Sequence, residues 1–478
     1  MSLLQALSVA SEAYPLVKTG GLADVVGALP AALAPHGVAV TTLIPAYPAL
    51  AAATKGAQML HKWADLLGTP ARLLGLSVGG HPFLVLDAPA LFARPGGLYG
   101  HDDDWRRFAA LGRAAADIAT GILPKRRFDL VHAHDWQAAM AAAYVRYAPT
   151  GPDRPRSVVT IHNIAFQGQF PATIFPDLDL PDEAWAVDGV EYYGGVGFLK
   201  AGLEAADAIT TVSPTYAAEI RESRFGMGLE GLIQARATRV SGIVNGIDPA
   251  VWNPATDAAL PARYTARTLA KRRTNKRSLE RAFALDRDDG PLFCVVSRLT
   301  WQKGIDVLAQ CLDGLVAAGG RLALLGSGDA HLEDAFRAAA ERHPGRIGVV
   351  IGYDEPLSHL LQGGADAILI PSRFEPCGLT QLYGLAYGCI PVVARTGGLA
   401  DTVIDANQAA LAAGVGTGFV HTDVGVEALN HAIARAIAAY ASPSVWTQLQ
   451  KNAMRADFSW GDSGRRYAQL YAKVTSAL

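Results

Sequence analysis

The stretch Ser372-Arg-Phe-Glu-Pro-Cys-Gly-Leu-Thr-Gln-Leu-Tyr-Gly-Leu-Ala-Tyr-Gly388 follows the apolar run Ala367-Ile-Leu-Ile370, and the two together decide the fold class. The apolar run is typical of a buried parallel strand, and Leu382 and Leu385 have helical spacing. Glu375 is therefore predicted on a turn from a strand to a helix. Open α/β sheets bind their ligands at this carboxyl end of their strands.

This turn offers several groups to a polar ligand. The amides of Gly378, Leu379 and Thr380 would begin the helix and could hold an anion. Cys377 lies beside Glu375 in the sequence and could be exposed to the same ligand. A carboxylate beside an anion site suits a substrate with both hydroxyls and phosphate. Taken alone, a single strand-turn-helix favours the alternative, in which Glu375 is a solvated turn residue and the glycines only cap the helix.

Length and composition indicate a globular enzyme of two or three domains. The chain has 478 residues, 50% hydrophobic and 18% charged, and a domain averages about 150 residues. The net charge of −2 gives no general attraction to nucleic acid or to an anionic membrane. No uncharged apolar run approaches the roughly 20 residues that span a bilayer. Four cysteines without metal-ligand spacing predict reduced thiols and a cytoplasmic protein.

Apolar runs alternate with helical patterns in two series, which predicts two parallel-sheet α/β domains. An irregular, proline-containing region at 249–275 separates the series and is predicted to be a linker, after a last strand that ends in 243–248. A final helix is predicted at 461–477. The predicted strands are 4–10, 38–44, 83–87, 128–135, 157–162 and 208–212 in the first series, and 292–297, 321–325, 347–351, 367–370 and 390–394 in the second.

A short internal repeat connects the two series. Lys18-Thr-Gly-Gly-Leu-Ala-Asp24 recurs as Arg395-Thr-Gly-Gly-Leu-Ala-Asp401. Each copy has a cation and two glycines before a predicted helix, and glycine lets backbone amides approach a ligand closely. The pattern predicts an anion-binding site in each half, with Gly20 and Gly21 in the first copy. The alternative is a chance match between two ordinary helix starts.

Two further cations follow the first strand of the second series. Arg298 and Lys303 in Ser297-Arg-Leu-Thr-Trp-Gln-Lys-Gly304 would lie before the next helix. Cations beside a helix N-terminus can bind a diphosphate. The alternative is that both are solvated surface residues. Because Lys303 adjoins the end of a strand, where ligands bind, we favour a functional role.

The sequence lacks the motifs of several other classes of nucleotide-binding and metal-binding protein. The sequence has no Gly-x4-Gly-Lys-Ser/Thr and no Gly-x-Gly-x-x-Gly after the first strand, which disfavours a P-loop ATPase and a nicotinamide dehydrogenase. His132 and His134 could share a metal with Asp135, because alternate strand residues point the same way. Such residues are more often satisfied by core hydrogen bonds, so we predict no metal site.

Seven motifs together resemble the bacterial glycogen synthase and plant starch synthase family of retaining glucosyltransferases, and the match covers essentially the whole chain. They are Lys18-Thr-Gly-Gly-Leu22, His132-Ala-His-Asp-Trp136, Thr160-Ile-His-Asn163, Val244-Asn-Gly-Ile-Asp248, Ser297-Arg-Leu-Thr-Trp-Gln-Lys-Gly304, Pro371-Ser-Arg-Phe-Glu-Pro-Cys-Gly-Leu379 and Arg395-Thr-Gly-Gly-Leu399.

The resemblance implies the GT-B fold, with two Rossmann-like domains that face a deep cleft. Residues 1–245 would form the acceptor-side domain, residues 246–457 the nucleotide-sugar domain, and residues 458–478 a helix that crosses back to the first. The implied reaction moves glucose from ADP-glucose to the non-reducing end of an α-1,4-glucan such as glycogen. The anomeric configuration is retained and ADP leaves. No cofactor is implied.

The resemblance also implies roles for individual residues, carried over by position. Arg298 and Lys303 would bind the diphosphate as it leaves. Glu375 would bind the glucosyl hydroxyls, while His162 and Asp135 would line the other side of the sugar. These five are the predicted catalytic residues.

The implied substrate-binding residues surround these. Lys18 with Gly20 and Gly21 would approach the donor from the first domain, and Tyr353 would stack on adenine. Asn245 would line the cleft, and Tyr99 is a weaker candidate on the acceptor side. The remaining members of this set are Asp24, Asn163, Cys377, Gly378, Leu379 and Thr380.

Three functions stay open at this point. The favoured one is an ADP-glucose-dependent glucan synthase. The second is a same-fold transferase that uses UDP-glucose or another acceptor, and the third is a non-catalytic glucan-binding protein. Many retaining relatives have a second glutamate eight positions after the first, where this chain has Tyr383. That departure puts any mechanism with two glutamates in doubt. Oligomeric state has no signal in the sequence.

Overall fold

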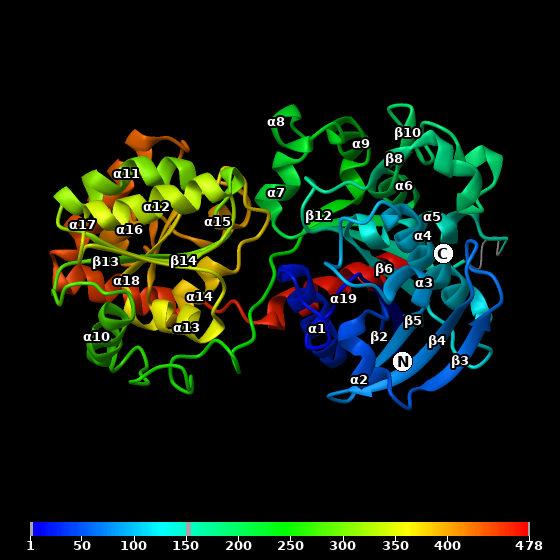
Figure 1. Cartoon of the computed structure of the whole chain (residues 1–478), viewed down its shortest axis with the longest axis horizontal. Helices are drawn as coiled ribbons and strands as arrows, with labels where there is room; N and C mark the ends of the chain where they lie inside the picture. The colour runs from blue at the N-terminus through cyan, green and yellow to red at the C-terminus, as the bar shows by residue number, and fades with distance from the viewer. Residues whose placement is uncertain (1–2, 150–153, 477–478) are drawn as a thin grey trace. The chain divides into compact units, whose positions relative to one another are not determined.

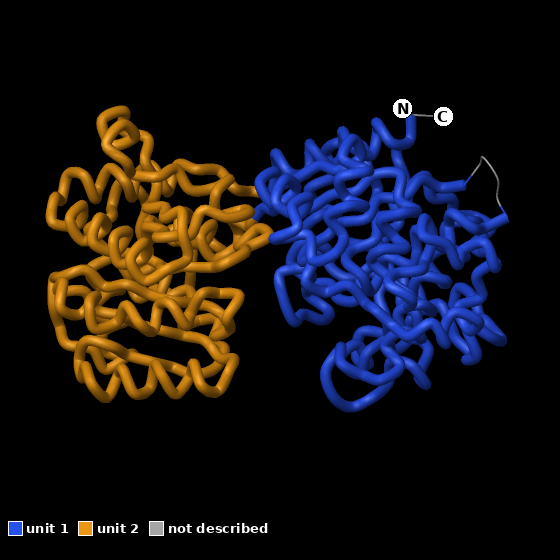
Figure 2. Tube along the Cα trace, turned by 90° about the horizontal axis from the view of Figure 1, so that it is seen from above, with its two compact units in different colours: residues 1–246, 460–478 blue, residues 247–459 orange. Residues whose placement is uncertain are grey.

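The computed structural model describes residues 3–149 and 154–476; Ala477, the predicted end of the last helix, lies outside them. The chain forms two compact units (Figures 1 and 2). Unit 1 comprises residues 1–246 and 460–478, and unit 2 comprises residues 247–459. Each unit contains its own predominantly parallel sheet, so the predicted α/β class with two parallel-sheet domains is confirmed. Among the described residues, no helix combines the length and the apolar character needed to cross a membrane.

The sheet of unit 1 has nine strands in the order β12-β11-β7-β6-β1-β2-β5-β4-β3. The strands from β12 to β5 are parallel, while β5, β4 and β3 continue as antiparallel neighbours. They are β1 (Leu4–Val9), β2 (Val38–Pro45), β3 (Gln58–Trp63), β4 (Ala71–Val78), β5 (His81–Asp87), β6 (Leu130–His134), β7 (Arg156–Ile161), β11 (Ala208–Thr211) and β12 (Val240–Gly242).

Helices cover both faces of this sheet. On one face, α5 is rich in alanine, and glycines of α4 and α6 let those helices approach it closely: a Cβ on Gly112 or Gly202 would lie 2.9 or 2.6 Å from α5. On the other face, α1 and α19 bury Leu29, Leu33 and Tyr467. The helices of unit 1 are α1 (Gly21–Leu33), α2 (Ala51–Thr54), α3 (Pro89–Phe92), α4 (Asp104–Asp117), α5 (Asp135–Tyr147), α6 (Phe198–Ala205), α7 (Pro214–Glu219), α8 (Ser223–Gly226), α9 (Glu230–Ala235) and α19 (Trp460–Ser476).

Unit 1 also has a small antiparallel sheet that the sequence patterns did not predict. Its order is β8-β10-β9, with β8 (Gln169–Pro171), β9 (Glu191–Tyr192) and β10 (Gly195–Gly197). The strands have only two or three residues, which is too short for a period-two pattern to be recognised. In Figure 1 strands β8 and β10 lie beside α9.

The sheet of unit 2 is entirely parallel, in the order β15-β14-β13-β16-β17-β18. Its strands are β13 (Leu292–Val296), β14 (Arg321–Gly326), β15 (Ile347–Ile351), β16 (Ala367–Ile370), β17 (Ile390–Ala394) and β18 (Phe419–His421). Helices α11, α12 and α17 pack on one face, and α10 and α13 on the other. The helices are α10 (Arg272–Ala282), α11 (Ile305–Ala317), α12 (Ala330–Arg342), α13 (Glu355–Gly364), α14 (Thr380–Tyr387), α15 (Gly397–Thr402), α16 (Gln408–Ala413), α17 (Val426–Tyr440) and α18 (Pro443–Arg455).

The predicted linker at 249–275 is wrong. The segment packs on unit 2, because the Trp252 indole stacks between His359 and Tyr383, with ring centroids 3.9 and 3.6 Å apart. Asp257 accepts a 2.7 Å hydrogen bond from His359 Nδ1. The region has an irregular backbone, but several of its side chains, among them Asp257, Leu260 and Tyr264, are buried. The irregularity alone suggested a linker.

The predicted strand end at 243–248 is also wrong. β12 ends at Gly242, which pairs with Thr211, the last residue of β11. The Ile243 amide still donates to the Thr211 carbonyl at 2.8 Å, but the neighbouring chain then turns into α7 at Pro214, and the pairing with β11 ends there.

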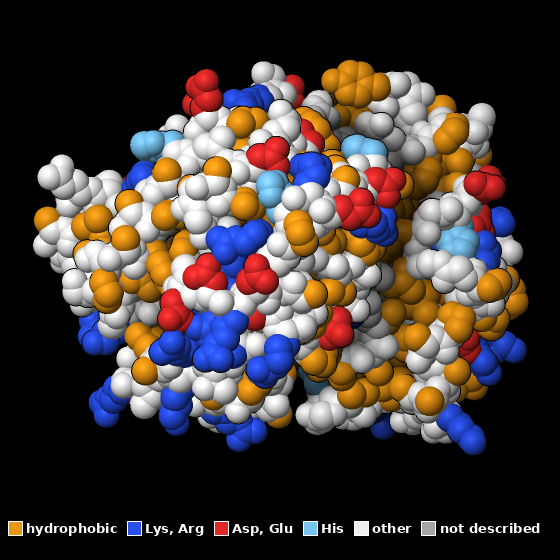
Figure 3. Space-filling model, turned by 60° about the vertical axis from the view of Figure 1, so that its left-hand side comes forward, with side chains coloured by type: hydrophobic (Ala, Val, Ile, Leu, Met, Phe, Trp, Pro, Cys, Tyr) orange, Lys and Arg blue, Asp and Glu red, His pale blue; other side chains and the backbone are white. Residues whose placement is uncertain are grey.

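Charged side chains of both signs lie next to one another on the face shown in Figure 3. Close pairs of opposite charge also occur at α10, where both Arg273 and Arg277 pair with Asp289. The highly basic sequence of α10 is therefore partly neutralised by its neighbours.

The packing of α19 on α1 gives a stability prediction. A Cβ on Gly464 would lie 2.4 Å from the carbonyl oxygen of Ala32, so Gly464→Ala forces the two helices apart. We expect it to lower the free energy of unfolding by about 1–3 kcal/mol in urea denaturation. Gly231→Ala is the control, because no atom lies within 4 Å of that Cβ in helix α9. It should be neutral or stabilise by up to about 1 kcal/mol. Equal destabilisation by both changes would contradict this packing.

Candidate active site

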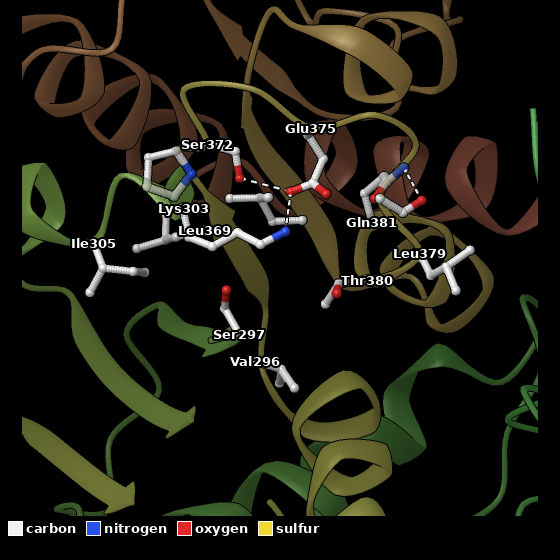
Figure 4. Close-up of a pocket in the computed structure, with 13 residues that line it drawn as sticks. Val296, Ser297, Lys303, Ile305, Leu369, Ser372, Glu375, Leu379, Thr380 and Gln381 are labelled. Carbon is white, nitrogen blue, oxygen red and sulfur yellow. Dashed lines mark hydrogen bonds and ion pairs between the residues drawn. The ribbon is translucent and has the colours of Figure 1, made fainter. Parts of the chain in front are cut away.

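A pocket in unit 2 lies at the carboxyl ends of the neighbouring strands β13 and β16, and Figure 4 shows the residues that line it. Lys303 Nζ lies 2.6 Å from Glu375 Oε2, and the Ser372 hydroxyl donates a 2.9 Å hydrogen bond to the same oxygen. The Glu375 side chain is buried. Among the described residues nothing donates to Glu375 Oε1, so this oxygen can accept a ligand hydroxyl.

Contacts between two turns hold this ion pair in place. The Arg373 guanidinium binds both oxygens of Asp306 at 2.6 and 2.7 Å, and the Arg373 amide donates to the carbonyl of Gln302. Gly304 has a φ of 65°, and a Cβ there would lie 1.9 Å from the Pro371 carbonyl oxygen. The turn before α11 and the turn before α14 are therefore packed backbone against backbone. The sequence patterns did not identify the roles of Arg373 and Asp306.

The second copy of the glycine repeat supports the Glu375 turn. The Gly398 amide donates to the carbonyls of Glu375 and Pro376, both at 3.1 Å. A Cβ on Gly397 would lie 1.9 Å from the Glu375 carbonyl oxygen. The prediction that this copy presents its amides to an anion is therefore wrong for Gly398. The close approach of two backbones explains its glycines instead.

Helix α14 begins at Thr380, with Leu379 as its N-cap residue. Its first amides have no partner within the helix and line the same pocket as Glu375. Gln381 fixes the turn, because its side-chain amide donates to the carbonyls of Cys377 and Gly378. Cys377 itself is buried, so the expectation that its side chain is exposed to a ligand is wrong.

Two other predicted residues of unit 2 are exposed. Arg298 follows β13 and makes no side-chain hydrogen bond or ion pair with any described residue, so its guanidinium is available. Tyr353 follows β15, and its side chain is 74% exposed, with its hydroxyl 3.2 Å from Glu355 Oε2. Neither lines the pocket around Glu375.

In unit 1 the first copy of the repeat has a different environment. Lys18 Nζ pairs with Asp24 at 2.8 Å. No atom lies within 4 Å of a Cβ placed on Gly20, and α1 begins at Gly21. The amides at the start of α1 therefore border open space.

A buried carboxylate positions this loop, and the sequence patterns missed it. Glu12 accepts hydrogen bonds from the Thr19 amide and hydroxyl and from the Tyr99 hydroxyl. Tyr99 also bonds Ser11 at 2.8 Å, so its hydroxyl is already used within unit 1. An isolated acidic residue three positions after β1 carries no local pattern that could have revealed this role.

The carboxyl ends of β6 and β7 bring three histidines together. His134 Nδ1 lies 3.0 Å from His162 Nε2, and His134 Nε2 lies 3.2 Å from the Ser8 hydroxyl. His132 bonds Thr160 and the Tyr471 hydroxyl of α19. Burial lowers the pKa of His132 and of His162 to about 3 and that of His134 well below its usual value. All three imidazoles are therefore neutral at pH 7.

Asp135 has a φ of 57° at the junction between β6 and α5. Its carboxylate accepts hydrogen bonds from the amides of His162 at 2.6 Å and Asn163 at 3.3 Å. Burial nevertheless raises the pKa of Asp135 to about 7. Asp135, His162 and Asn163 are thus brought together as one group.

Asn245 follows β12 and is buried, and its Oδ1 has no hydrogen-bond partner among the described residues. Within residues 3–149 and 154–476, no three or more His, Cys, Asp or Glu side chains are grouped so that they could hold a metal ion. His132 and His134 are instead occupied by Thr160, Tyr471 and Ser8.

Both halves of the chain match models of known protein families. Residues 5–235 match the starch synthase catalytic domain, and residues 276–453 match glycosyl transferases group 1. The chain is 65% identical to the glycogen synthase of Novosphingobium aromaticivorans, over 98% of this chain and 99% of the relative. It is 58% identical to that of Mesorhizobium japonicum, over 99% of each.

Two solved structures are similar to this chain over nearly its whole length. The catalytic domain of starch synthase IV from Arabidopsis thaliana, bound to ADP and acarbose, has a TM-score of 0.88 and 32% identity, with 99% of this chain and all of that chain covered. A sucrose-phosphate synthase from Thermosynechococcus elongatus, at 18% identity and a TM-score of 0.61, shares the fold over 99% of this chain and all of its own. The fold is that of a GT-B glycosyltransferase. Within that class, the chain belongs to the glycogen synthase family.

The Gly397 contact predicts a large effect of a single methyl group. Gly397→Ala should lower the free energy of unfolding by at least about 3 kcal/mol, because the methyl group overlaps the Glu375 carbonyl. Gly414→Ala is the matched control: its φ is 68°, but no atom lies within 4 Å of the new Cβ. It should cost only about 1–2 kcal/mol from backbone strain. If urea denaturation gives similar losses of unfolding free energy for the two variants, the contact between Gly397 and the Glu375 carbonyl is unimportant for stability.

The neutral histidines predict a pH dependence for unit 1. Between about pH 6.5 and 3 the unfolded chain binds protons that folded His132, His134 and His162 do not, so stability falls on acidification. The raised pKa of Asp135 opposes this, because between about pH 4 and 7 its folded form binds the extra proton. Three groups outweigh one, so the net effect is a loss of stability in acid.

His162→Asn tests this assignment. It should reduce the pH slope of the unfolding free energy by up to about 1.4 kcal/mol per pH unit, the effect of one proton. Hydrogen exchange of β6 and β7 peptides at pH 7.0 and 5.0 measures the slope, with β13 and β16 peptides as the internal reference. A variant with the slope of the wild type would remove His162 from the acid-sensitive group.

Proposed function

We propose that this chain transfers glucose from ADP-glucose to the non-reducing end of an α-1,4-glucan, with retention of configuration and release of ADP. The observation that carries the proposal is the Lys303–Glu375 pair at the carboxyl ends of β13 and β16. Support also comes from relatives that are named glycogen synthase and from the starch synthase IV domain, which is bound to ADP and acarbose.

Lys303 and Arg298 are proposed to bind the diphosphate. Negative charge grows on the diphosphate as the glucosyl centre becomes positive, so preorganised cations stabilise the transition state. Without a ligand, Lys303 neutralises Glu375. When the diphosphate binds, the Lys303 ammonium can bridge the phosphate and the carboxylate, while the exposed Arg298 adds a second cation. The first amides of α14 supply further donors.

Glu375 is proposed to bind the glucosyl hydroxyls rather than to attack the sugar. Its Oε2 already accepts hydrogen bonds from Lys303 and Ser372, which lowers its nucleophilicity. Tyr383, eight positions further on, stacks against Trp252 and supplies no second carboxylate. We therefore favour a front-face route in which the leaving phosphate accepts the proton of the acceptor hydroxyl.

We assign the nucleotide sugar to unit 2 and the acceptor side to unit 1. Tyr353 is proposed to stack on adenine, since its ring is exposed. Neutral His162 can hydrogen-bond a sugar hydroxyl without adding charge, beside Asp135 and Asn163. Lys18, with the amides of Gly20 and Gly21, would approach the donor phosphates. Asn245, Asp24 and Tyr99 complete the proposed set.

No cofactor or metal is part of the proposal, and the chain is proposed to act in the cytoplasm. A stacking tyrosine tolerates any base, so UDP-glucose is the donor that must be compared.

The test is the initial rate of transfer to glycogen from ADP-glucose and from UDP-glucose, with a chelator present. We expect fast transfer from ADP-glucose alone. Fast transfer from UDP-glucose would indicate a different transferase, and no transfer from either would support a glucan-binding protein. Activity that chelation abolishes would overturn the metal-free mechanism.

Glu375→Ala and Lys303→Ala should each lower kcat by about 100-fold or more, because each removes a group at the reacting centre. Lys271→Ala, at an exposed lysine of the same unit, is the control and should leave kcat unchanged. Circular dichroism checks that each variant is folded. A near-normal rate in either site variant would remove that residue from the catalytic set.

A further inference from the structure

A series of hydrogen bonds crosses three neighbouring strands of unit 1. Ser8 lies on β1, His134 ends β6, and His162 directly follows β7; β6 lies between the other two strands in the sheet. The Ser8 hydroxyl lies 3.2 Å from His134 Nε2, and His134 Nδ1 lies 3.0 Å from His162 Nε2. We call these three residues the imidazole series. Ser8 and His134 are buried, whereas His162 is half-buried and is the member that a ligand can reach.

His134 has a partner on each of its ring nitrogens. Burial lowers its pKa well below the usual value, so the ring is neutral and carries a single N–H. A neutral imidazole donates a hydrogen bond from one nitrogen and accepts one at the other. Two arrangements are therefore open: the hydrogen bonds run either from Ser8 towards His162 or from His162 towards Ser8.

The surroundings of Ser8 distinguish the two arrangements. Among the described residues, His134 is the only hydrogen-bond partner of the Ser8 hydroxyl, and the side chain is 3% exposed. If His134 Nε2 donated to Ser8, the hydroxyl hydrogen would be buried without an acceptor, which costs free energy. If the hydroxyl donates to Nε2 instead, each hydrogen between Ser8 and His162 has an acceptor. The bonds therefore run from Ser8 towards His162.

This direction decides which nitrogen of His162 carries the proton. The His134 proton is on Nδ1 and is donated to His162 Nε2. The pKa of His162 is about 3, so its ring is neutral too, and its single proton is on Nδ1, because Nε2 accepts. No described residue accepts a hydrogen bond from His162 Nδ1. The Nδ1–H group is therefore free to donate to a ligand.

We propose that Ser8 and His134 are positioning residues that hold His162 in its Nδ1–H form, so that it meets a bound ligand as a hydrogen-bond donor. The Asp135 carboxylate accepts the His162 amide at 2.6 Å and fixes the backbone beside the ring. A donor here fits an oxygen atom of a sugar. Because Nδ1 already carries a proton, it cannot be the base that removes a proton from a hydroxyl. That the ligand is the glucosyl group of ADP-glucose rests on the proposed function.

Nitrogen NMR detects the position of the proton without any substrate. Protonated and unprotonated imidazole nitrogens have well-separated chemical shifts, so correlation spectra of protein with isotopically labelled histidine report the tautomer of each ring. His162→Asn identifies the His162 signals by their absence. At pH 7.0 we expect the His162 proton on Nδ1. A proton on Nε2 would overturn the proposal.

Ser8→Ala removes the hydroxyl and leaves both imidazoles in place. His134 Nε2 then loses its donor, so we expect the His162 proton to be distributed over Nδ1 and Nε2. The value of kcat/KM for ADP-glucose should fall about two- to tenfold, the effect of one neutral hydrogen bond. Ser8→Thr, which retains a hydroxyl on a side chain suited to a strand, should keep the wild-type tautomer.

Thr210→Val is the matched control. It removes another buried hydroxyl from the same sheet, on β11, but this hydroxyl bonds Thr160 and no member of the imidazole series. We expect the His162 tautomer and kcat/KM to stay as in the wild type. If Thr210→Val changes the tautomer as much as Ser8→Ala does, or if Ser8→Ala changes nothing, Ser8 does not position His162.

The remaining outcomes separate this proposal from the proposed function. If the tautomer depends on Ser8 but the wild type transfers no glucose from ADP-glucose, the proposed function fails and the positioning role stands. If transfer is normal and His162 is protonated on Nε2, only the positioning role fails. A changed tautomer with an unchanged kcat/KM would overturn the role of His162 as a donor to the ligand.

Discussion

The close approach of bare backbone at Gly304 and Gly397 is the constraint on which the site in unit 2 depends. Each glycine would place a Cβ 1.9 Å from a carbonyl oxygen, of Pro371 and Glu375 respectively. Segments far apart in the sequence are thereby fixed on either side of the Glu375 turn. The 2.6 Å separation of Lys303 and Glu375 follows from that packing rather than from mutual attraction alone. An ion pair with a buried carboxylate needs such support, because the cost of burying a charge offsets much of the attraction.

The histidine group of unit 1 buries polar side chains in their neutral form instead of as an ion pair. Its histidines avoid the cost of buried charge by staying neutral, and each has a hydroxyl or imidazole partner. Asp135 is an intermediate case. Two backbone amides stabilise its charged form and lower its pKa, but burial has the larger effect and raises the pKa. The two units therefore bury these polar groups with contrasting electrostatics. Unit 2 holds the Lys303–Glu375 ion pair, and unit 1 holds neutral imidazoles.

The sequence predicted what depends on local pattern. The turn at Glu375 follows a buried strand and precedes a helix, as its apolar run and helical spacing indicate, and the same holds for Lys303. Contacts between distant segments left no local pattern. The second glycine repeat was interpreted as a ligand site because its partner, the Glu375 turn, is invisible in a short window. Glu12 and Tyr471 were missed for the same reason, since their partners are 87 and 339 residues away. The segment around Trp252 looked like a linker because its order comes from stacking, not from hydrogen-bonded periodicity.

Helix α19 belongs to unit 1 but follows unit 2 in the chain. It buries Tyr467 and Tyr471 against the sheet, and the Tyr471 hydroxyl bonds His132 at 2.6 Å. During synthesis from the N-terminus, unit 2 is therefore complete before unit 1 can cover this face. The nascent chain exposes this apolar face of unit 1 until α19 has been made. The core of the first unit is thus completed only by a segment that is synthesised after the whole of the second.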